Sequence, residues 1–334
     1  MKKSNFTRIL AVLPAVLMFI ALTGCGSKQT SDNTPTDAAT SAGLTPAITS
    51  QITPSAAPTE AEDEPAGDVS EGYVGTVEYD GSELPLYLSG GMSFCLTPEG
   101  EAVLISTFLS DDSLEYYTIP EAITYEGRTY PVTKIDNDAF NGYSELTGIV
   151  ISSSVRSLGN SAFESCEALE SVFVPEGVEI LGDAVFSGCV SLKSVALPSS
   201  VKEIGSGIFF DCSALENVVL PEGLTAIPKD TFTNCTNLTD LIIPSSVTAI
   251  GDEAFWSCSS LTALQLPDSL VSIGNRAFYD CGGISEFTFP ASLSSIGEDI
   301  FEYCDSLSIL RVPSGSVSKY KGMFEDAEFE ITGY

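Results

Sequence analysis

The sequence predicts a solenoid of stacked 23-residue coils, mostly β with short helical turns, and three periodic features predict it. A leucine or isoleucine follows the phenylalanine by six residues in eight coils, and further aliphatic or aromatic residues follow at nine and eleven. Periods of about 20 to 50 residues are typical of solenoids, because one repeat cannot bury its apolar face alone. The phenylalanines recur with one fixed period, without a slip, at Phe140, Phe163, Phe186, Phe209, Phe232, Phe255, Phe278, Phe301 and Phe324.

The leucine-containing half of each coil predicts a short strand. Leu261, Leu264 and Leu266 form an L-x-x-L-x-L phrase that alternates at its end, as expected of a strand with one buried face. Proline follows directly in seven coils, from Pro175 to Pro313. A proline there ends the strand without removing a hydrogen bond from its ladder.

The second half of each coil predicts an extended segment, a bend and a helical turn. Glycine follows V/L-x-x-I/L, as in Val247–Gly251, and we interpret it as a bend that a Cβ would obstruct. Small polar residues come next and suit the N-cap of a helical turn that carries the phenylalanine, which predicts a stacked aromatic ladder inside the solenoid. These predicted caps are Asn160, Asp183, Ser206, Asp252 and Asn275.

The full phrase LxxLxIPxxVxxIGxxAFxxC, over about residues 113–313, resembles the BspA-type leucine-rich repeat of bacterial surface proteins. The resemblance implies a leucine-rich repeat solenoid and a role in adhesion, and it carries over no ligand-binding residue. In the first coil Pro120 lies much further ahead of Phe140 than Pro175 lies ahead of Phe186, which predicts an inserted loop. Residues 73–112 are predicted to form an N-terminal β cap and residues 314–334 a C-terminal cap.

The part of the chain before the N-terminal cap follows targeting rules rather than folding rules. A basic start, an apolar stretch at Ile9–Ala21 and the ending Leu22–Cys25 predict a signal peptide over residues 1–24. The ending resembles a lipobox, which implies a diacylglyceryl thioether on Cys25 and the membrane as a partner; the alternative is an ordinary signal peptide with an incidental Cys25. Residues 25–72 are rich in Ser, Thr, Pro, Ala and acids, and we predict a disordered tether.

Composition excludes several classes of partner and of chemistry. The net charge is −32, with 46 acidic residues against 14 Lys and Arg, which excludes nucleic acid as a partner. The chain has no histidine, which removes His-based triads and zinc sites. There is no phosphate-binding glycine loop, GxSxG elbow or complete calcium loop. We therefore predict no catalytic residue, no metal site and no cofactor.

Seven cysteines occupy one column of the repeat, three residues after each phenylalanine. Three states are open to them: buried free thiols, disulfides between neighbouring coils, and a metal cluster. Their odd number, the lack of a CxxC pair, and Tyr143 and Ala327 at the same position in the end copies favour buried free thiols. The column consists of Cys166, Cys189, Cys212, Cys235, Cys258, Cys281 and Cys304.

Two surface stripes are candidate binding sites. Phe173, Val219 and Ile242 lie between the inward residues of their strands, so they face outward from the sheet. A second stripe, an aromatic ledge, follows the phenylalanine ladder by one residue in neighbouring coils. For both stripes the alternative is partial burial or plain β-propensity. The ledge contains Phe210, Trp256 and Tyr279, with rings expected about 5 to 10 Å apart.

Three functions compete on this evidence. The first is a lipid-anchored cell-surface binding or adhesion protein that engages a protein or a glycan through its repeats. The second is an accessory or catalytic component of extracellular glycan breakdown that uses two carboxylates, and the third is a structural spacer without a ligand. A shallow apolar stripe favours binding, a deep pocket with two convergent carboxylates favours the enzyme, and uniformly polar faces favour the spacer.

Overall fold

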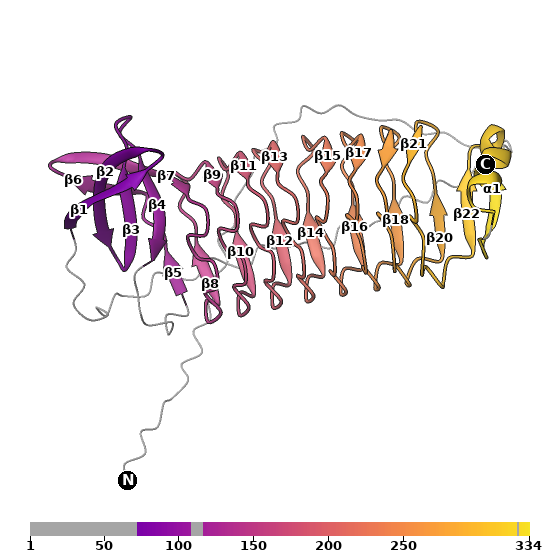
Figure 1. The fold of residues 1–334 in the computed structure, drawn as a ribbon, viewed down its shortest axis with the longest axis horizontal. Coiled ribbons are helices and arrows are strands. Elements are labelled where there is room, and N and C mark those ends of the chain that lie inside the picture. Colours follow the sequence, from indigo (N-terminus) through magenta and orange to yellow (C-terminus); the bar gives the residue numbers. More distant parts are fainter. Residues whose placement is uncertain (1–71, 108–115, 326) are drawn as a thin grey trace, which may run out of the picture. The chain divides into compact units, whose positions relative to one another are not determined.

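The structure is a computed structural model that describes residues 72–107, 116–325 and 327–334. The predicted signal peptide, Cys25 and nearly all of the predicted tether lie outside the described residues. In the described part the chain winds into coils of the predicted period, and most strands pair in parallel with their equivalents one coil on (Figure 1). The predicted solenoid is thereby confirmed.

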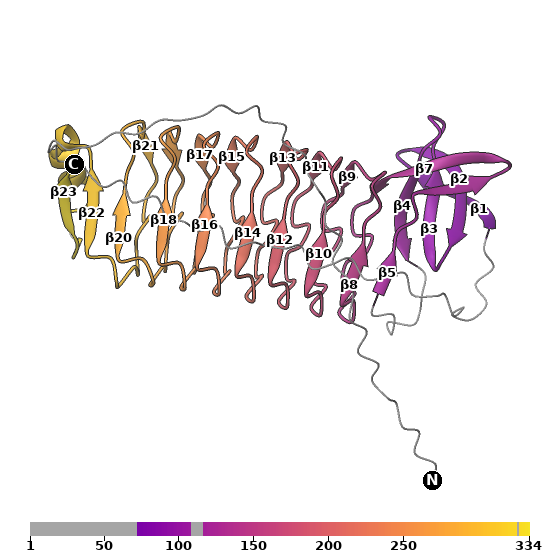
Figure 2. The same ribbon diagram turned by 180° about the vertical axis from the view of Figure 1, so that it is seen from behind.

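Each coil contributes a longer and a shorter strand, which stack into separate faces (Figures 1 and 2). We call the outward surface of the longer strands the sheet face. These strands are β5 (Tyr116–Thr118), β8 (Gly148–Val150), β10 (Ser171–Phe173), β12 (Ser194–Ala196), β14 (Asn217–Val219), β16 (Asp240–Ile242), β18 (Ala263–Gln265), β20 (Glu286–Thr288) and β22 (Ile309–Val312). The shorter strands are β9 (Ser157–Leu158), β11 (Ile180–Leu181), β13 (Glu203–Ile204), β15 (Ala226–Ile227), β17 (Ala249–Ile250), β19 (Ser272–Ile273) and β21 (Ser295–Ile296).

The segment that carries each phenylalanine is a series of turns, not the helical turn predicted from the sequence. From the coil of Phe140 to that of Phe301, the residues two before and two after the phenylalanine are left-handed, with φ of 51° to 62° and 54° to 80° respectively. A helix needs φ near about −63°, so these residues exclude one. The backbone donates instead to the next coil, as from the Phe232 N–H to the Ala254 carbonyl at 2.8 Å.

The polar residues predicted as N-caps have a different role, which is to join neighbouring coils. The Asn160 Oδ1 accepts a hydrogen bond from the Asp183 N–H at 2.9 Å, and the Asp252 Oδ1 accepts one from the Asn275 N–H at 2.7 Å. The partner is the backbone of the following coil because the left-handed residues leave no helix to cap. The side chains thus form a ladder along the solenoid.

The repeated glycines allow neighbouring coils to approach closely. A Cβ on Gly251 would lie 2.5 Å from the Lys229 nitrogen, and one on Gly274 would lie 2.4 Å from the Asp252 nitrogen. Neither glycine has a positive φ, so neither is needed for a left-handed bend. A Cβ would be obstructed, as predicted, but the obstruction comes from the backbone of the neighbouring coil.

The solenoid core contains the predicted aromatic ladder. From Phe140 to Phe301 neighbouring rings stack with centroids 5.2 to 6.0 Å apart and planes within 24°. At the ends Tyr117 contacts the Phe140 ring edge-on at 5.5 Å, and Phe324 meets Phe301 at 6.1 Å in a tilted geometry. The ladder is therefore covered by aromatic side chains at both ends.

The cysteine column is buried beside this ladder as free thiols. Each Sγ donates a hydrogen bond to the carbonyl of the phenylalanine one coil back, at 3.0 to 3.2 Å, as from Cys235 to Phe209. Burial raises the pKa of the Cys166 thiol to about 12 and that of Cys235 well above its usual range. Outside the column, Cys95 is buried with Leu84 and Val103.

These thiols should resist modification in the native protein. In a Cys25→Ala background, we expect iodoacetamide at pH 8 to label the column only when denaturant opens the solenoid, because only exposed thiolate reacts. Cys235→Ala should lower the free energy of unfolding by about 1 kcal/mol through lost packing. Mass spectrometry of labelled peptides checks the first result, and rapid native labelling of several column thiols would contradict it.

Caps protect the two end coils. Before the repeats, β1 (Gly72–Tyr79), β2 (Ser82–Ser89), β3 (Met92–Leu96) and β4 (Ala102–Thr107) form an antiparallel sheet whose last strand pairs with β7 (Arg128–Ile135), and β7 in turn pairs with β9. At the other end, η1 (Ser314–Ser316) and α1 (Val317–Met323) precede β23 (Glu330–Gly333), which pairs with β22. Each cap thereby pairs one open sheet edge of the repeats, on the shorter-strand side at the N-terminal end and on the longer-strand side at the C-terminal end.

The insertion in the first coil is a β-hairpin and not the predicted loop. β6 (Ala122–Tyr125) pairs antiparallel with β7 across a turn at Glu126 and Gly127. Both turn residues have positive φ, at 49° and 76°, which matches the two-residue turns that favour hairpins.

The strand ladders of both faces are interrupted together at one place, and the ladder of the longer strands is interrupted once more, between β18 and β20. β13 does not pair with β15, and β14 does not pair with β16. On the shorter-strand side, Pro228 stands where other coils have glycine, and it has no N–H to match the 2.9 Å bond from Gly205 to the Leu181 carbonyl. The turns remain bonded there, since the Phe209 N–H donates to the Thr231 carbonyl at 3.0 Å.

Candidate functional site

The sheet face carries an exposed apolar stripe. Phe173, Val219 and Ile242 are 54%, 42% and 76% exposed, and Ala196 lies between the first two and is also exposed. They end four successive strands, β10, β12, β14 and β16, whose middle residues are buried. Alternation along a strand therefore turns these side chains outward, as predicted. We call Phe173, Ala196, Val219 and Ile242 the apolar stripe.

Acidic side chains line both edges of the apolar stripe. Glu170 and Glu216 lie three residues before Phe173 and Val219, whereas Glu176 and Glu222 lie three residues after them, and all four are exposed. The cation on this rim, Lys193, pairs with Glu170 at 3.0 Å. The stripe is thus an apolar surface with a negative rim.

The structure divides the predicted aromatic ledge. The Trp256 and Tyr279 rings stack at 4.1 Å, closer than expected from the coil spacing, and both are partly exposed. Phe210 is also partly exposed but lies two coils before Trp256. Thr233 separates them, and its buried side chain donates to the Glu253 carbonyl at 2.7 Å. Trp256 and Tyr279 therefore form one cluster, without Phe210.

A third aromatic residue, missed from the sequence, extends this cluster. Tyr303 is 57% exposed and meets the Tyr279 ring edge-on at 5.0 Å. It stands two residues after Phe301, whereas the sequence comparison followed the column one residue after each phenylalanine. The sequence did contain a signal for Tyr303. The position two residues after the phenylalanine is Gly, Ser, Asp or Asn in the preceding coils, and Tyr303 departs from that pattern. We call Trp256, Tyr279 and Tyr303 the aromatic cluster.

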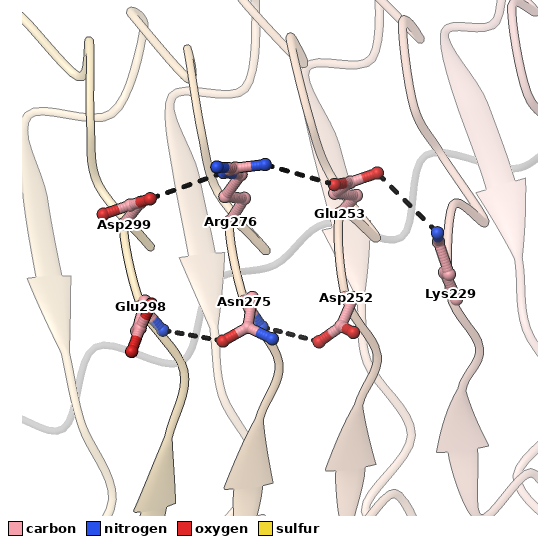
Figure 3. A pocket seen from close by; sticks show the side chains of 7 residues that line it. All are labelled: Lys229, Asp252, Glu253, Asn275, Arg276, Glu298 and Asp299. Atoms are coloured by element: carbon pink, nitrogen blue, oxygen red, sulfur yellow. Dashed lines mark hydrogen bonds and ion pairs between the residues drawn. The ribbon is translucent and has the colours of Figure 1, made fainter.

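A depression of about 380 Å³ lies on the segment between the shorter strands and the turns (Figure 3). In one row, backbone-to-side-chain hydrogen bonds join its members: the Glu298 N–H donates to Asn275 Oδ1 and the Asn275 N–H to Asp252 Oδ1. In a second row, charges of alternating sign follow one another along four coils, carried by Lys229, Glu253, Arg276 and Asp299. The depression is lined by Lys229, Asp252, Glu253, Asn275, Arg276, Glu298 and Asp299.

The ion pairs of this second row are long. Lys229 and Arg276 make four N–O contacts of 3.4 to 4.0 Å with neighbouring carboxylates, whereas the other four ion pairs of the described residues measure 2.5 to 3.1 Å. Arg276 also contacts the aromatic cluster, because its guanidinium lies over the Trp256 ring, 5.9 Å from the ring centroid. The depression and the aromatic cluster therefore meet at Arg276.

The carboxylates of the depression do not face one another as a catalytic pair. Glu253 lies between Lys229 and Arg276, and Asp299 pairs with Arg276 (Figure 3). A glycosidase needs one protonated and one ionised carboxyl on opposite sides of a bond. Each of these carboxylates lies beside a cation instead, an arrangement that suits binding better than hydrolysis.

Comparison with known families identifies the repeat. The family model of the BspA type leucine rich repeat region matches in six copies over residues 133–262 and 225–332. The chain belongs to the BspA-type leucine-rich repeat family. Proteins of this family are typically found on bacterial cell surfaces, and no catalytic family is indicated. No curated protein matches the chain.

Solved leucine-rich repeat structures resemble this fold. A leucine-rich repeat protein from Bacteroides ovatus ATCC 8483 is 24% identical with a TM-score of 0.54, and the match covers 77% of each chain. A leucine rich cell surface protein from Faecalibacterium prausnitzii A2-165 is 21% identical over 74% of this chain and 94% of its own, with a TM-score of 0.38. The first of these likenesses supports the fold. Among the described residues, no helix is long and apolar enough to cross a membrane.

Proposed function

We propose that this BspA-type protein is a lipid-anchored cell-surface binding protein that holds a protein partner on its sheet face. The apolar stripe is the observation that carries the proposal, because four neighbouring strands expose apolar side chains where solubility favours polar ones. A spacer without a ligand does not need such a stripe.

The rim of the stripe indicates the chemistry of the partner. Glu170, Glu176, Glu216 and Glu222 surround an apolar strip in a chain of net charge −32. A complementary partner presents apolar side chains with Lys or Arg beside them. Charge complementarity of this kind speeds association and weakens as salt screens it.

Ile242 gives the sharpest test of this surface. The full-length protein is first used to recover partners from host extracellular proteins, mucins and polysaccharides. Ile242→Asp should then weaken binding of a recovered protein by at least about tenfold, because a charge replaces the most exposed large apolar side chain of the stripe. Gln265→Asp adds the same charge at the same position one coil on, beyond the stripe, and should have a much smaller effect.

Surface plasmon resonance at several salt concentrations measures both effects, and the melting temperatures of the variants should stay close to that of the parent. Recovery of polysaccharide alone contradicts the proposal, as does a protein partner that binds Ile242→Asp as tightly as the parent. The anchor is tested separately: Cys25→Ala should lose lipid labelling and leave the membrane fraction, and unchanged labelling would exclude lipid on Cys25.

A further inference from the structure

We propose that the depression at Arg276, together with the aromatic cluster, binds a neutral oligosaccharide. This site goes beyond the proposed protein-binding function, because it is built from the segments after the shorter strands and from the turns, whereas the apolar stripe belongs to the longer strands. Its failure would leave the role of the stripe unaffected. The inference stands on three features: the long ion pairs, the exposed aromatic rings and the arrangement of charge.

The long ion pairs leave room for sugar hydroxyl groups. The Arg276 Nε donates a long hydrogen bond of 3.4 Å to Asp299 Oδ2, and its Nη1 lies 3.9 Å from Glu253 Oε1, beyond hydrogen-bond distance. A hydroxyl group can donate to a carboxylate and accept from a guanidinium at the same time, so it can bridge such a gap. Vicinal hydroxyl groups of a pyranose present this pair of functions repeatedly, which matches a row in which cations and carboxylates alternate.

The aromatic cluster supplies the apolar part of the same surface. Trp256, Tyr279 and Tyr303 form a chain of ring contacts at 4.1 and 5.0 Å across three coils, and Arg276 lies over the first ring at 5.9 Å. Aromatic rings next to a few fixed polar groups are typical of small-molecule sites, since the rings contact apolar C–H groups while the polar groups orient the ligand.

Backbone strain at Tyr303 points to a ligand rather than to packing. Tyr303 has φ of 60° at a position where the seven preceding coils have Gly, Ser, Asp or Asn. A left-handed backbone is unfavourable for an aromatic residue, and residues in such conformations gather at functional sites. The ring is largely exposed and so recovers little of this cost by burial.

Charge determines which saccharide fits. The depression contains four carboxylates, from Asp252, Glu253, Glu298 and Asp299, against two cations, and both cations already face carboxylates. An acidic saccharide would bring further negative charge to this surface, and like charges repel. A neutral chain avoids the repulsion and still satisfies donors and acceptors of both signs.

The chain itself contains the reporter for this site, because Trp256 is its single tryptophan. The full-length protein is titrated with neutral hexasaccharides built from glucose, mannose, xylose or N-acetylglucosamine, and with an oligogalacturonate of equal length. At least one neutral hexasaccharide should change the Trp256 emission saturably, and the oligogalacturonate should not. Isothermal titration calorimetry provides the affinity.

Two variants separate binding from folding. Tyr303→Asn relieves the left-handed strain, since Asn234 adopts the same conformation at the equivalent position. This variant should keep or raise the melting temperature and should weaken saccharide binding by at least about tenfold. Arg276→Met should weaken saccharide binding to a similar extent. Arg311→Met is the matched control, since Arg311 is about equally exposed and pairs with Glu286 on the sheet face; this variant and Ile242→Asp should bind the saccharide as the parent does.

Several outcomes would overturn the proposal. One is a Trp256 emission that no neutral hexasaccharide changes. Another is an oligogalacturonate that binds as tightly as the neutral chains. Unchanged saccharide affinity in both Tyr303→Asn and Arg276→Met would also exclude this surface as the site.

Discussion

Replacing Gly274 by alanine should lower the free energy of unfolding by about 3 kcal/mol, because the new methyl group meets rigid atoms of the preceding coil. The added Cβ would lie 2.4 Å from the Asp252 nitrogen and 2.5 Å from the Gly251 carbonyl carbon. Both are backbone atoms, so the coils must separate to relieve the overlap. Separation in turn weakens the 2.8 Å hydrogen bond from the Gly274 N–H to the Ile250 carbonyl.

Gly282 provides the matched control for this change. A Cβ on Gly282 meets nothing within 4 Å, and its φ is not positive, so Gly282→Ala should be neutral or slightly stabilising. Urea unfolding followed by circular dichroism measures both variants. Equal midpoints for Gly274→Ala and Gly282→Ala would show that close approach of the coils is not the reason for the glycine column.

The break at Pro228 shows how the chain tolerates a departure from that column. Pro228 occupies a glycine position and cannot donate to the preceding coil, and the strand ladders are unpaired there on both faces. The turn bonds and the Phe209–Phe232 stack at 5.6 Å continue across the break. The core and the turns thus hold this pair of coils together where the strands do not.

The repeated sequence predicted those features that depend on the inside or outside position of a residue within one coil. The regular period assigned Phe140 to Phe301 to one buried column, and strand alternation placed Phe173, Val219 and Ile242 outside. Stacking identical coils repeats each contact, so a single rule covers the whole column. The donation from the cysteine thiols to phenylalanine carbonyls adds a reason for cysteine that the pattern alone did not show.

Features that depend on contacts between coils could not be read in the same way. Asn and Asp are favoured both as helix N-caps and in left-handed or inter-coil positions, so Asn160 and Asp252 fitted a cap equally well. The ion pairs of Arg276 join side chains of neighbouring coils, and Tyr303 reaches Tyr279 from a different column of the repeat. The depression and the contact of Tyr303 therefore emerged only from the structure, whereas Trp256 and Tyr279 were already neighbours in the predicted ledge.

Phe232→Ala should cost about 4 kcal/mol, since it removes a fully buried ring from the middle of the ladder. The ring stacks on Phe209 at 5.6 Å and on Phe255 at 5.3 Å, so a single cavity disturbs three coils. The effect should be large here because the neighbouring strand ladders are already interrupted beside Pro228. In a solenoid, stability is approximately a sum of coil and interface contributions, and a weakened interface can open before the rest.

Phe173→Ala removes the same side chain from the sheet face, where it is 54% exposed, and should change stability by less than about 1 kcal/mol. Urea unfolding should be followed by circular dichroism for the whole repeat array and by Trp256 emission for the coils beyond the break. In Phe232→Ala both signals should move to lower urea, and they should separate if the array opens first at this interface. Equal losses for Phe232→Ala and Phe173→Ala would mean that the stacked ladder is not what holds the coils together, because burial is the main difference between the two rings.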